Sequence, residues 1–442
     1  MEIGPVRPMP LMDHYASTRR PAARSTPSSF GLFGWSVAAM IWVGIGRVTE
    51  FIPLLRGLPL GKIAVVLALT AYWARGSRRS GFPPLLSTPL GRNAALLAAI
   101  GLVSITFSIW RSQTLHEIGE CTAIAAEFWL VYTASSTWRN ARLLLGHVAA
   151  ASGALALTAA AQYTGGRAEV HSGYDTNDLA YVLVVVLPLA YAGAVTAKGW
   201  NRLLWASLCG AFVIAVLLTA SRGGVVGLVV VVLGLVFSAD TRLAPAGKPR
   251  ASRRTALIAL LCLIVFCTLC WRILPAETRG RMQTFAHLDT DYNMQRGHDS
   301  RLDIWIRSAS SLVKRPIGFG LGTFQAVDGM TGGQYRAPHN SEVQIGVELG
   351  FLGLWLYLRM YLLSWRVLRR VSLPPATVTA GVETDDQKRI FAANLRISLL
   401  GNFTAGFFLS QAYSNLIWIL FALIAAMALA QTPAPRVIER RA

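Results

Sequence analysis

The feature that most constrains this chain is a repeated block of about 17 to 23 apolar residues, because a helix needs about 20 such residues to cross the bilayer core. Short segments rich in Arg, Gly, Pro and Ser separate the blocks. Charged residues make up 14% of the chain and hydrophobic residues 53%, whereas about 25% of an average soluble domain is charged. These properties exclude a soluble enzyme, a DNA-binding domain and a disordered scaffold. The sequence predicts an all-α, polytopic helical membrane protein.

The blocks predict about twelve transmembrane helices. Their expected ranges are 31–46, 58–74, 93–110, 118–136, 143–163, 178–196, 202–220, 223–238, 255–273, 341–364, 391–409 and 412–430. The chain then divides into a polar N-terminus (1–30), nine spans (31–273), one large loop with short helices (274–340), three spans (341–430) and a tail (431–442).

The basic residues predict the orientation, because cytoplasmic loops collect Lys and Arg. One assignment, with both termini cytoplasmic, places a basic cluster in every alternate loop, and an even number of spans agrees with it. The clusters include Arg19 and Arg20, Arg78 and Arg79, Arg139 and Arg142, Lys198 and Arg202, Arg253 and Arg254, and Arg369 and Arg370.

The large loop contradicts this rule, since it lies outside and is still strongly basic. It contains Arg279, Arg281, Arg296, Arg301, Arg307, Lys314, Arg315 and Arg336. The formal charge of the whole chain, +20, is explained largely by the cytoplasmic loops, but this excess indicates an anionic substrate at the outer surface. Arg222, in the tight turn Ser221–Gly224, is a second candidate, because an arginine beside apolar helices is costly unless it is paired or solvated; an interfacial, snorkelling Arg is the alternative.

Within the loop, Ser300 and Asp303 have capping-box spacing, and apolar residues recur at helical spacing behind them. We expect an amphipathic helix over about 301–314, with Arg301 in its first turn, lying on the membrane surface or capping the bundle. Three glycines follow within 318–322. No strand precedes them, so we reject a dinucleotide-binding loop and expect a turn with close backbone approach.

His339 comes directly before the tenth span, where Asn340 or Ser341 can cap the helix. The positive end of the helix dipole disfavours imidazolium and attracts anions, so the ring would be neutral and able to accept a proton. An interfacial polar histidine is the alternative, but the nearby outer arginines favour a functional role.

Two residue patterns resemble parts of a metal site, but each lacks the further ligands that a metal ion would need. Asp289 and Asp291 form an acidic pair without further oxygen ligands, and Cys267 and Cys270 lie in an apolar run without a second pair. We therefore predict no metal and no cofactor.

Taken together, these residues resemble the bacterial O-antigen ligase and O-antigen polymerase superfamily. The resemblance covers about 170–365, and the first 165 residues contain no matching motif. The matching motifs, in order, are Asp175–Asn177, Ser221–Gly223, Arg301–Trp305, Arg315–Phe324, His339–Ser341 and Glu348–Gly350.

The resemblance implies a metal-independent glycosyltransferase of the bacterial inner membrane, with a periplasmic active site. It would take a glycan from undecaprenyl diphosphate and pass it to a lipid A-core acceptor, without a nucleotide sugar or a nucleic acid. His339 would activate the acceptor hydroxyl. Substrate binding would fall to Arg222, Arg301, Asn177, Asn340 and one of Arg279 and Arg281.

Several alternatives stay open. A polymerase would join lipid-linked repeat units, and relatives transfer glycans to protein; we favour the ligase because of the position of its single large loop. The segment 407–413 could line the acceptor side or be a packed rim. A polysaccharide or lipid transporter is a rival of another class, but the hydrophobic blocks show no internal repeat and the polar candidates gather at one rim.

Overall fold

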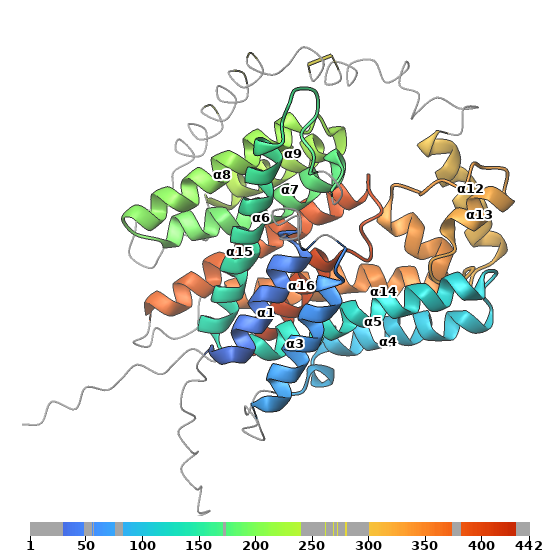
Figure 1. The fold of residues 1–442 in the computed structure, drawn as a ribbon, viewed down its shortest axis with the longest axis horizontal. Coiled ribbons are helices and arrows are strands. Elements are labelled where there is room, and N and C mark those ends of the chain that lie inside the picture. The colour runs from blue at the N-terminus through green and yellow to red at the C-terminus, as the bar shows by residue number, and fades with distance from the viewer. Residues whose placement is uncertain are drawn as a thin grey trace, which may run out of the picture.

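The computed structural model describes residues 30–47, 57–75, 83–170, 174–239, 300–373 and 382–429, together with Leu55, Leu261, Thr268, Arg272, Arg279 and Gly280. Helices dominate these ranges, and the β-structure within them is an isolated bridge between Val170 and Tyr174. The colour bar of Figure 1 relates each helix to its place in the chain.

A helix lies at each predicted span except the ninth, 255–273, which falls almost wholly outside the described residues. The apolar helices are α1 (Gly31–Gly44), α3 (Leu60–Ala74), α4 (Pro89–Val103), α5 (Arg111–Ala134), α6 (Trp138–Ala161), α7 (Thr176–Thr196), α8 (Trp200–Leu218), α9 (Arg222–Ala239), α14 (Ser341–Ser372), α15 (Val382–Gly406) and α16 (Asn415–Met427). The large loop contributes α12 (Arg301–Lys314) and α13 (Phe324–Met330), and the short 3-10 turns η2 (Leu85–Ser87) and η3 (Ser104–Thr106) flank α4.

Within the described ranges, five helices are long and apolar enough to cross a membrane: α4 with η3, α6, α7, α8 and α14. Helices α1, α3, α9 and α16 are apolar but shorter. A helical membrane protein is thus confirmed, and twelve crossings remain a prediction. Helix α5 is long but less apolar, because it contains Glu117, Glu120 and Glu127.

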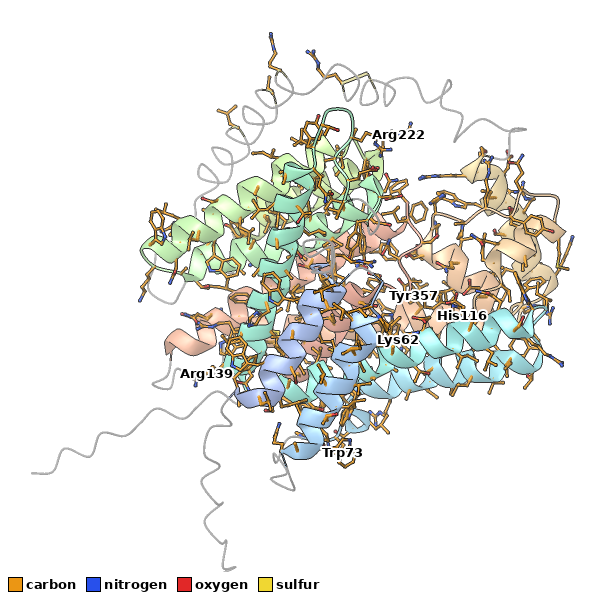
Figure 2. All side chains as sticks on the ribbon, viewed as in Figure 1. Lys62, Trp73, His116, Arg139, Arg222 and Tyr357 are labelled. Atoms are coloured by element: carbon orange, nitrogen blue, oxygen red, sulfur yellow. The ribbon has the colours of Figure 1, made fainter. Side chains whose placement is uncertain are left out.

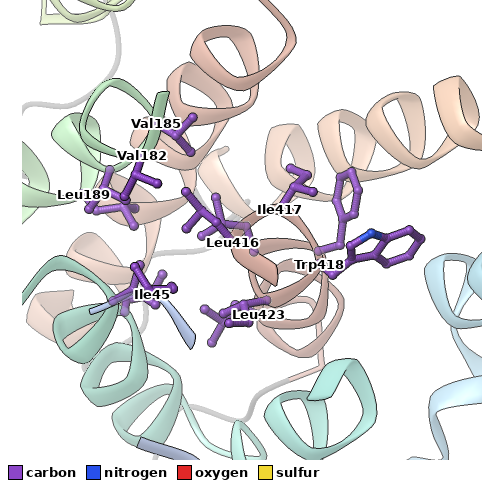
Figure 3. Close-up of a cluster of buried hydrophobic side chains, with 14 of the residues drawn as sticks. Ile45, Val182, Val185, Leu189, Leu416, Ile417, Trp418 and Leu423 are labelled. Atoms are coloured by element: carbon purple, nitrogen blue, oxygen red, sulfur yellow. The ribbon is translucent and has the colours of Figure 1, made fainter. Parts of the chain in front are cut away.

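Helix α7 forms the centre of the bundle and packs against α6, α8, α9 and α15. Glycines let these helices approach closely, as small residues do in membrane proteins. A Cβ on Gly224 of α9 would lie 2.5 Å from the Cβ of Ala180, and a Cβ on Gly401 of α15 would lie 2.5 Å from a methyl of Val231. Figure 3 shows part of the apolar core, where Val182, Val185 and Leu189 of α7 face the start of α16.

Buried hydroxyl and amide groups connect the same helices. The Asn402 amide donates to the Tyr181 hydroxyl at 2.6 Å, and the Tyr361 hydroxyl donates to the Asn402 carbonyl oxygen at 2.6 Å. Helices α7, α14 and α15 are thereby joined inside the bundle, where unsatisfied polar groups would be costly.

Helices α12 and α13 lie together at one end of the molecule, beside the ends of α4, α5 and α14 (Figure 1). They have a small core of their own, made of Ile304, Phe324 and Val327 packed on Val347 of α14. The capping box of α12 forms as expected: Ser300 Oγ accepts from the Asp303 backbone N–H at 3.2 Å, and the Asp303 carboxylate accepts from the Ser300 N–H at 3.2 Å.

The glycine segment 318–322 is inserted against a break in α14. Gly350 has a φ of +71°, and the broken helix frees carbonyl groups that the segment uses. Phe319 N–H donates to Val347 O at 3.0 Å, and Phe351 N–H donates to Pro316 O at 2.9 Å. A Cβ on Gly318 would lie 2.5 Å from Glu348 O. The expected close backbone approach is therefore present, with α14 as its partner.

Candidate functional site

The first turn of α7 brings two of the predicted motifs together. Asp175 caps the helix, its carboxylate accepting from the N–H groups of Asn177 at 2.7 Å and Asp178 at 2.8 Å. The Asn177 side-chain oxygen accepts from the Ser221 hydroxyl at 2.8 Å and from Arg167 at 3.5 Å. Asn177 is therefore linked to the turn that carries Arg222.

That turn is as tight as the sequence predicted, since α8 ends at Leu218 and α9 begins at Arg222. Ala220 takes a left-handed φ of +49°, and Ser221 Oγ accepts from the Gly224 N–H at 3.2 Å, which caps α9. A Cβ on Gly223 would lie 2.9 Å from Phe408. The glycine after Arg222 thus allows the segment after α15 to approach.

Arg301 reaches the same segment from the other side. Its guanidinium donates to the backbone oxygen of Phe408 at 3.4 Å. Phe408 therefore lies between the turn of Arg222 and the first turn of α12. Two arginines that are 79 positions apart in the sequence border one short segment. Figure 2 shows Arg222 toward the side of the molecule where α12 and α13 lie, and Arg139 away from it.

His339 is held in an uncommon conformation at the start of α14. Its φ is +48°, a left-handed value that costs a non-glycine residue free energy unless its surroundings fix it. The peptide before it is fixed by the Trp305 indole N–H, which donates to Pro338 O at 2.8 Å. The residue after it, Asn340, caps α14 by accepting from the Val343 N–H at 2.8 Å. Ser341, the other candidate cap, instead donates to Leu409 O at 2.8 Å.

The surroundings of His339 favour its neutral form. Burial lowers its pKa from the ordinary 6.5, and the positive charge of Arg301 lowers the pKa further, while Asp175 acts in the opposite direction. The expected direction is thus present, with burial as its largest cause. The charges of Arg301 in α12 and of Asp175, the cap of α7, therefore both act on the pKa of His339 at the start of α14.

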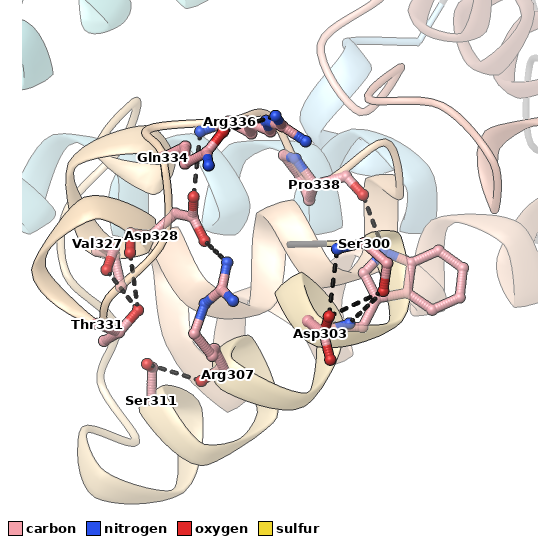
Figure 4. A network of polar contacts seen from close by, with 11 residues as sticks. Ser300, Asp303, Arg307, Ser311, Val327, Asp328, Thr331, Gln334, Arg336 and Pro338 are labelled. Atoms are coloured by element: carbon pink, nitrogen blue, oxygen red, sulfur yellow. Dashed lines mark hydrogen bonds and ion pairs between the residues drawn. The ribbon is translucent and has the colours of Figure 1, made fainter. Parts of the chain in front are cut away.

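A buried ion pair stabilises the loop that leads to His339 (Figure 4). Arg307 donates to the Asp328 carboxylate at 2.6 Å, and the side chain of Asp328 is only 2% exposed. The other oxygen of Asp328 accepts from the Arg336 N–H at 3.1 Å. Arg307 is therefore paired with Asp328 within the loop, which indicates a structural role for this arginine.

The remaining predicted residues lie elsewhere. Arg279 is a partly buried helical residue, but most of its sequence neighbours lie outside the described residues. Arg281 and the pairs Asp289/Asp291 and Cys267/Cys270 also lie outside them. Among the residues that are described, no group of three or more His, Cys, Asp or Glu could hold a metal ion.

The sequence left the segment 407–413 open between an acceptor lining and a packed rim and named Asp175 only as part of a motif, whereas the structure shows that residues of both connect the motifs. Phe408 and Gln411 belong to the segment after α15, and Asp175 acts both as a helix cap and as a charge near His339. Gln411 N–H donates to Ser341 Oγ at 2.9 Å, and its side chain donates to the Asp178 carboxylate at 2.6 Å. A polar Gln between apolar helices was the available signal.

Comparison with known proteins agrees with these motifs. Residues 206–358 match the family model described as O-antigen ligase. A search of curated proteins gave no match. The matched range contains Arg222, Arg301, the glycine segment and His339. Over residues 206–358 the chain is therefore similar to the O-antigen ligase family, in agreement with the resemblance that its motifs indicated.

Proposed function

We propose that this protein is a membrane glycosyltransferase of the O-antigen ligase type, which moves a glycan from undecaprenyl diphosphate to a lipid A-core acceptor. The observation that carries the proposal is the position of His339: partly buried, with a lowered pKa, and near the charges of Arg301 and Asp175. The O-antigen ligase family match over the same residues supports it.

The chemistry follows from these groups. His339 takes the proton of an acceptor hydroxyl while the hydroxyl oxygen bonds to the anomeric carbon of the donor sugar. The bond between that carbon and the diphosphate oxygen breaks, and the diphosphate leaves with the electron pair. Arg222 and Arg301 would stabilise its growing negative charge with paired N–H groups. Arg279 or Arg281 would add a third cation. In this proposal Asn177 and Asn340 shape the site from α7 and α14.

The topology belongs to the same proposal. The protein would cross the bacterial inner membrane about twelve times, with both termini in the cytoplasm. Residues 1–30 and 431–442 would be the cytoplasmic ends. The loop 274–340, between spans in 31–273 and 341–430, would lie in the periplasm with the active site.

The test is transfer by purified protein in detergent, with undecaprenyl-diphosphate glycan as donor. Lipid A-core and a second lipid-linked repeat unit are offered as acceptors. Transfer to lipid A-core alone supports the ligase, and ladders on the lipid carrier identify a polymerase. His339→Ala should lose about 10²–10⁴ in rate. A protein that moves lipid-linked glycan across vesicles but transfers it to neither acceptor would be a transporter.

The same assay tests metal independence. Treatment with EDTA should leave the rate unchanged, because the proposed charge stabilisation comes from arginines. A loss that added Mg²⁺ restores would contradict this part of the proposal.

A further inference from the structure

A second polar feature lies beside the proposed site: a cavity of about 600 Å³ between α1, α3, α5 and the start of α7. The segment 411–416 closes it on a further side. In the proposed topology, the ends of these helices that meet here are the periplasmic ends. The charged residues that line it are Arg47, Lys62, Glu117, Glu120, Glu127 and Asp178.

The charge of this cavity is opposite to that of the arginine site. Carboxylates outnumber basic side chains in its lining, and Lys62 is already paired with Glu120 at 2.9 Å near the surface. A diphosphate would be repelled here, whereas hydroxyl groups can donate to carboxylates. Tyr174 and Tyr413 also line the cavity and offer aromatic faces.

Glu127 is the residue that most clearly indicates a ligand. It is 5% exposed and lies in α5, yet it lines the cavity. One carboxylate oxygen accepts from the Asn415 amide at 3.4 Å, and the other has no hydrogen-bond partner among the described residues. Since an unsatisfied buried acceptor is costly, a ligand hydroxyl that donates to this oxygen would be favoured.

The cavity and the His339 site have a wall in common. Asp178 and Gln411 line the cavity, and their side chains are hydrogen-bonded to each other at 2.6 Å. The Gln411 backbone N–H also donates to Ser341 Oγ at 2.9 Å, and Ser341 lies two positions after His339. In the first turn of α7, Asn177 accepts from Ser221 in the turn before Arg222, and its neighbour Asp178 accepts from Gln411 in the cavity wall.

We propose that this cavity binds the sugar end of the acceptor: a hydroxyl-rich glycan without phosphate, whose reacting hydroxyl points to His339. This inference rests on the proposed function, because it assigns the acceptor to one side of α7 and the donor diphosphate to the other. The separation by charge supplies the reason: anions bind at Arg222 and Arg301, and neutral hydroxyls bind at Glu127 and Asp178.

Steady-state kinetics test the inference with whichever of the two acceptors the wild-type protein uses. Glu127→Gln keeps the shape of the side chain but replaces an acceptor oxygen by a donor. The KM for the acceptor should rise about tenfold, as when a buried hydrogen-bonding group loses its partner, while the KM for the donor should stay within about twofold. Ala123→Phe should raise the acceptor KM by filling the cavity from α5 without removing a charge. Glu169→Gln, an exposed carboxylate beside α7, is the matched control and should change neither constant.

A binding measurement separates this inference from the proposed function. The probe is dephosphorylated lipid A-core oligosaccharide without its lipid, followed by saturation-transfer NMR. The wild type and His339→Ala should bind it, and Glu127→Gln and Ala123→Phe should not. If the variants show this binding pattern but the wild-type protein transfers glycan to neither acceptor, the proposed reaction is wrong and the inferred glycan site still stands. A raised donor KM in Glu127→Gln, or unchanged glycan binding in both cavity variants, would overturn the inference.

Discussion

At the scale of single residues, the proposed site combines a histidine whose neutral form is favoured with two arginines. His339 is partly buried and close enough to Arg301 for the guanidinium to lower its pKa. The same arginine contacts the backbone of Phe408, which packs against the glycine that follows Arg222. The proposed base and the proposed phosphate ligands are thus coupled through a few contacts.

The lowered pKa of His339 predicts the pH dependence of transfer. The base must be neutral, so activity falls as the pH drops through its pKa, and the midpoint of this acid limb should lie below 6.5. Since the unfolded chain takes up this proton more readily, His339 also lowers the free energy of unfolding as the pH falls below 6.5. Values of kcat/KM measured between pH 5 and 8 give the midpoint of this acid limb, and a midpoint above 6.5 would contradict the prediction.

Arg301 should be needed for the chemical step. We expect Arg301→Ala to reduce kcat about 10²–10³-fold, in the range seen when one oxyanion stabiliser is removed. Arg301→Lys should restore little, because lysine lacks the planar fork of guanidinium. Arg111→Ala is the control, an exposed arginine at the start of α5. Near-wild-type kcat in Arg301→Ala would remove this residue from the site.

At the scale of elements, the break in α14 holds the loop against the bundle. The backbone groups freed at Gly350 bond to the segment that contains Pro316 and Phe319. The loop's helices then pack on α14 through Val347, and Trp305 of α12 holds the peptide before His339. A distortion in one helix therefore positions a residue eleven places before it in the chain.

Gly350→Ala tests this junction. A Cβ there would lie 2.2 Å from Pro316 O, and the φ of +71° is strained for alanine. We expect the free energy of unfolding to fall by more than about 1 kcal/mol, with a lower Tm in detergent and reduced transfer. Gly146→Ala in α6 meets no atom within 4 Å and should be neutral or slightly stabilising. Equal Tm values for the two variants would show that the junction is unimportant.

At the scale of the whole molecule, the motifs gather at one end of a helical bundle. The turn before α9, the start of α7, α12 and the start of α14 meet there, while Arg139, in the first turn of α6, lies away from them. A substrate that arrives from one side of the membrane could reach all of these groups.

Cysteine labelling tests the proposed orientation. In a cysteine-free background, Met330→Cys adds a thiol at a residue that is 68% exposed in the loop, and Arg139→Cys adds one at the start of α6. A membrane-impermeant maleimide should label the first in intact spheroplasts and the second only after permeabilisation. The reverse pattern would invert the topology.

The sequence by itself determined the helical membrane class, the helix 301–314 and the family motifs. Apolar blocks and capping residues are local signals, and they fix an element wherever the rest of the chain lies. The ends of several spans moved: α14 continues to Ser372 instead of residue 364, and α16 starts at Asn415 instead of residue 412. Apolarity marks the part of a helix that lies in lipid, whereas caps and polar turns decide where the helix begins and ends.

Only the tertiary structure decided what lies beside His339. Asp175, Trp305 and Arg301 come from different elements, and no periodicity in the sequence reports which helix ends meet. The left-handed backbone of His339 and the break at Gly350 depend on contacts over long sequence distances. Glu127 stood in a predicted span as an intramembrane carboxylate, a signal of function, but the cavity that it faces exists only once α1, α3, α5 and α7 have packed together.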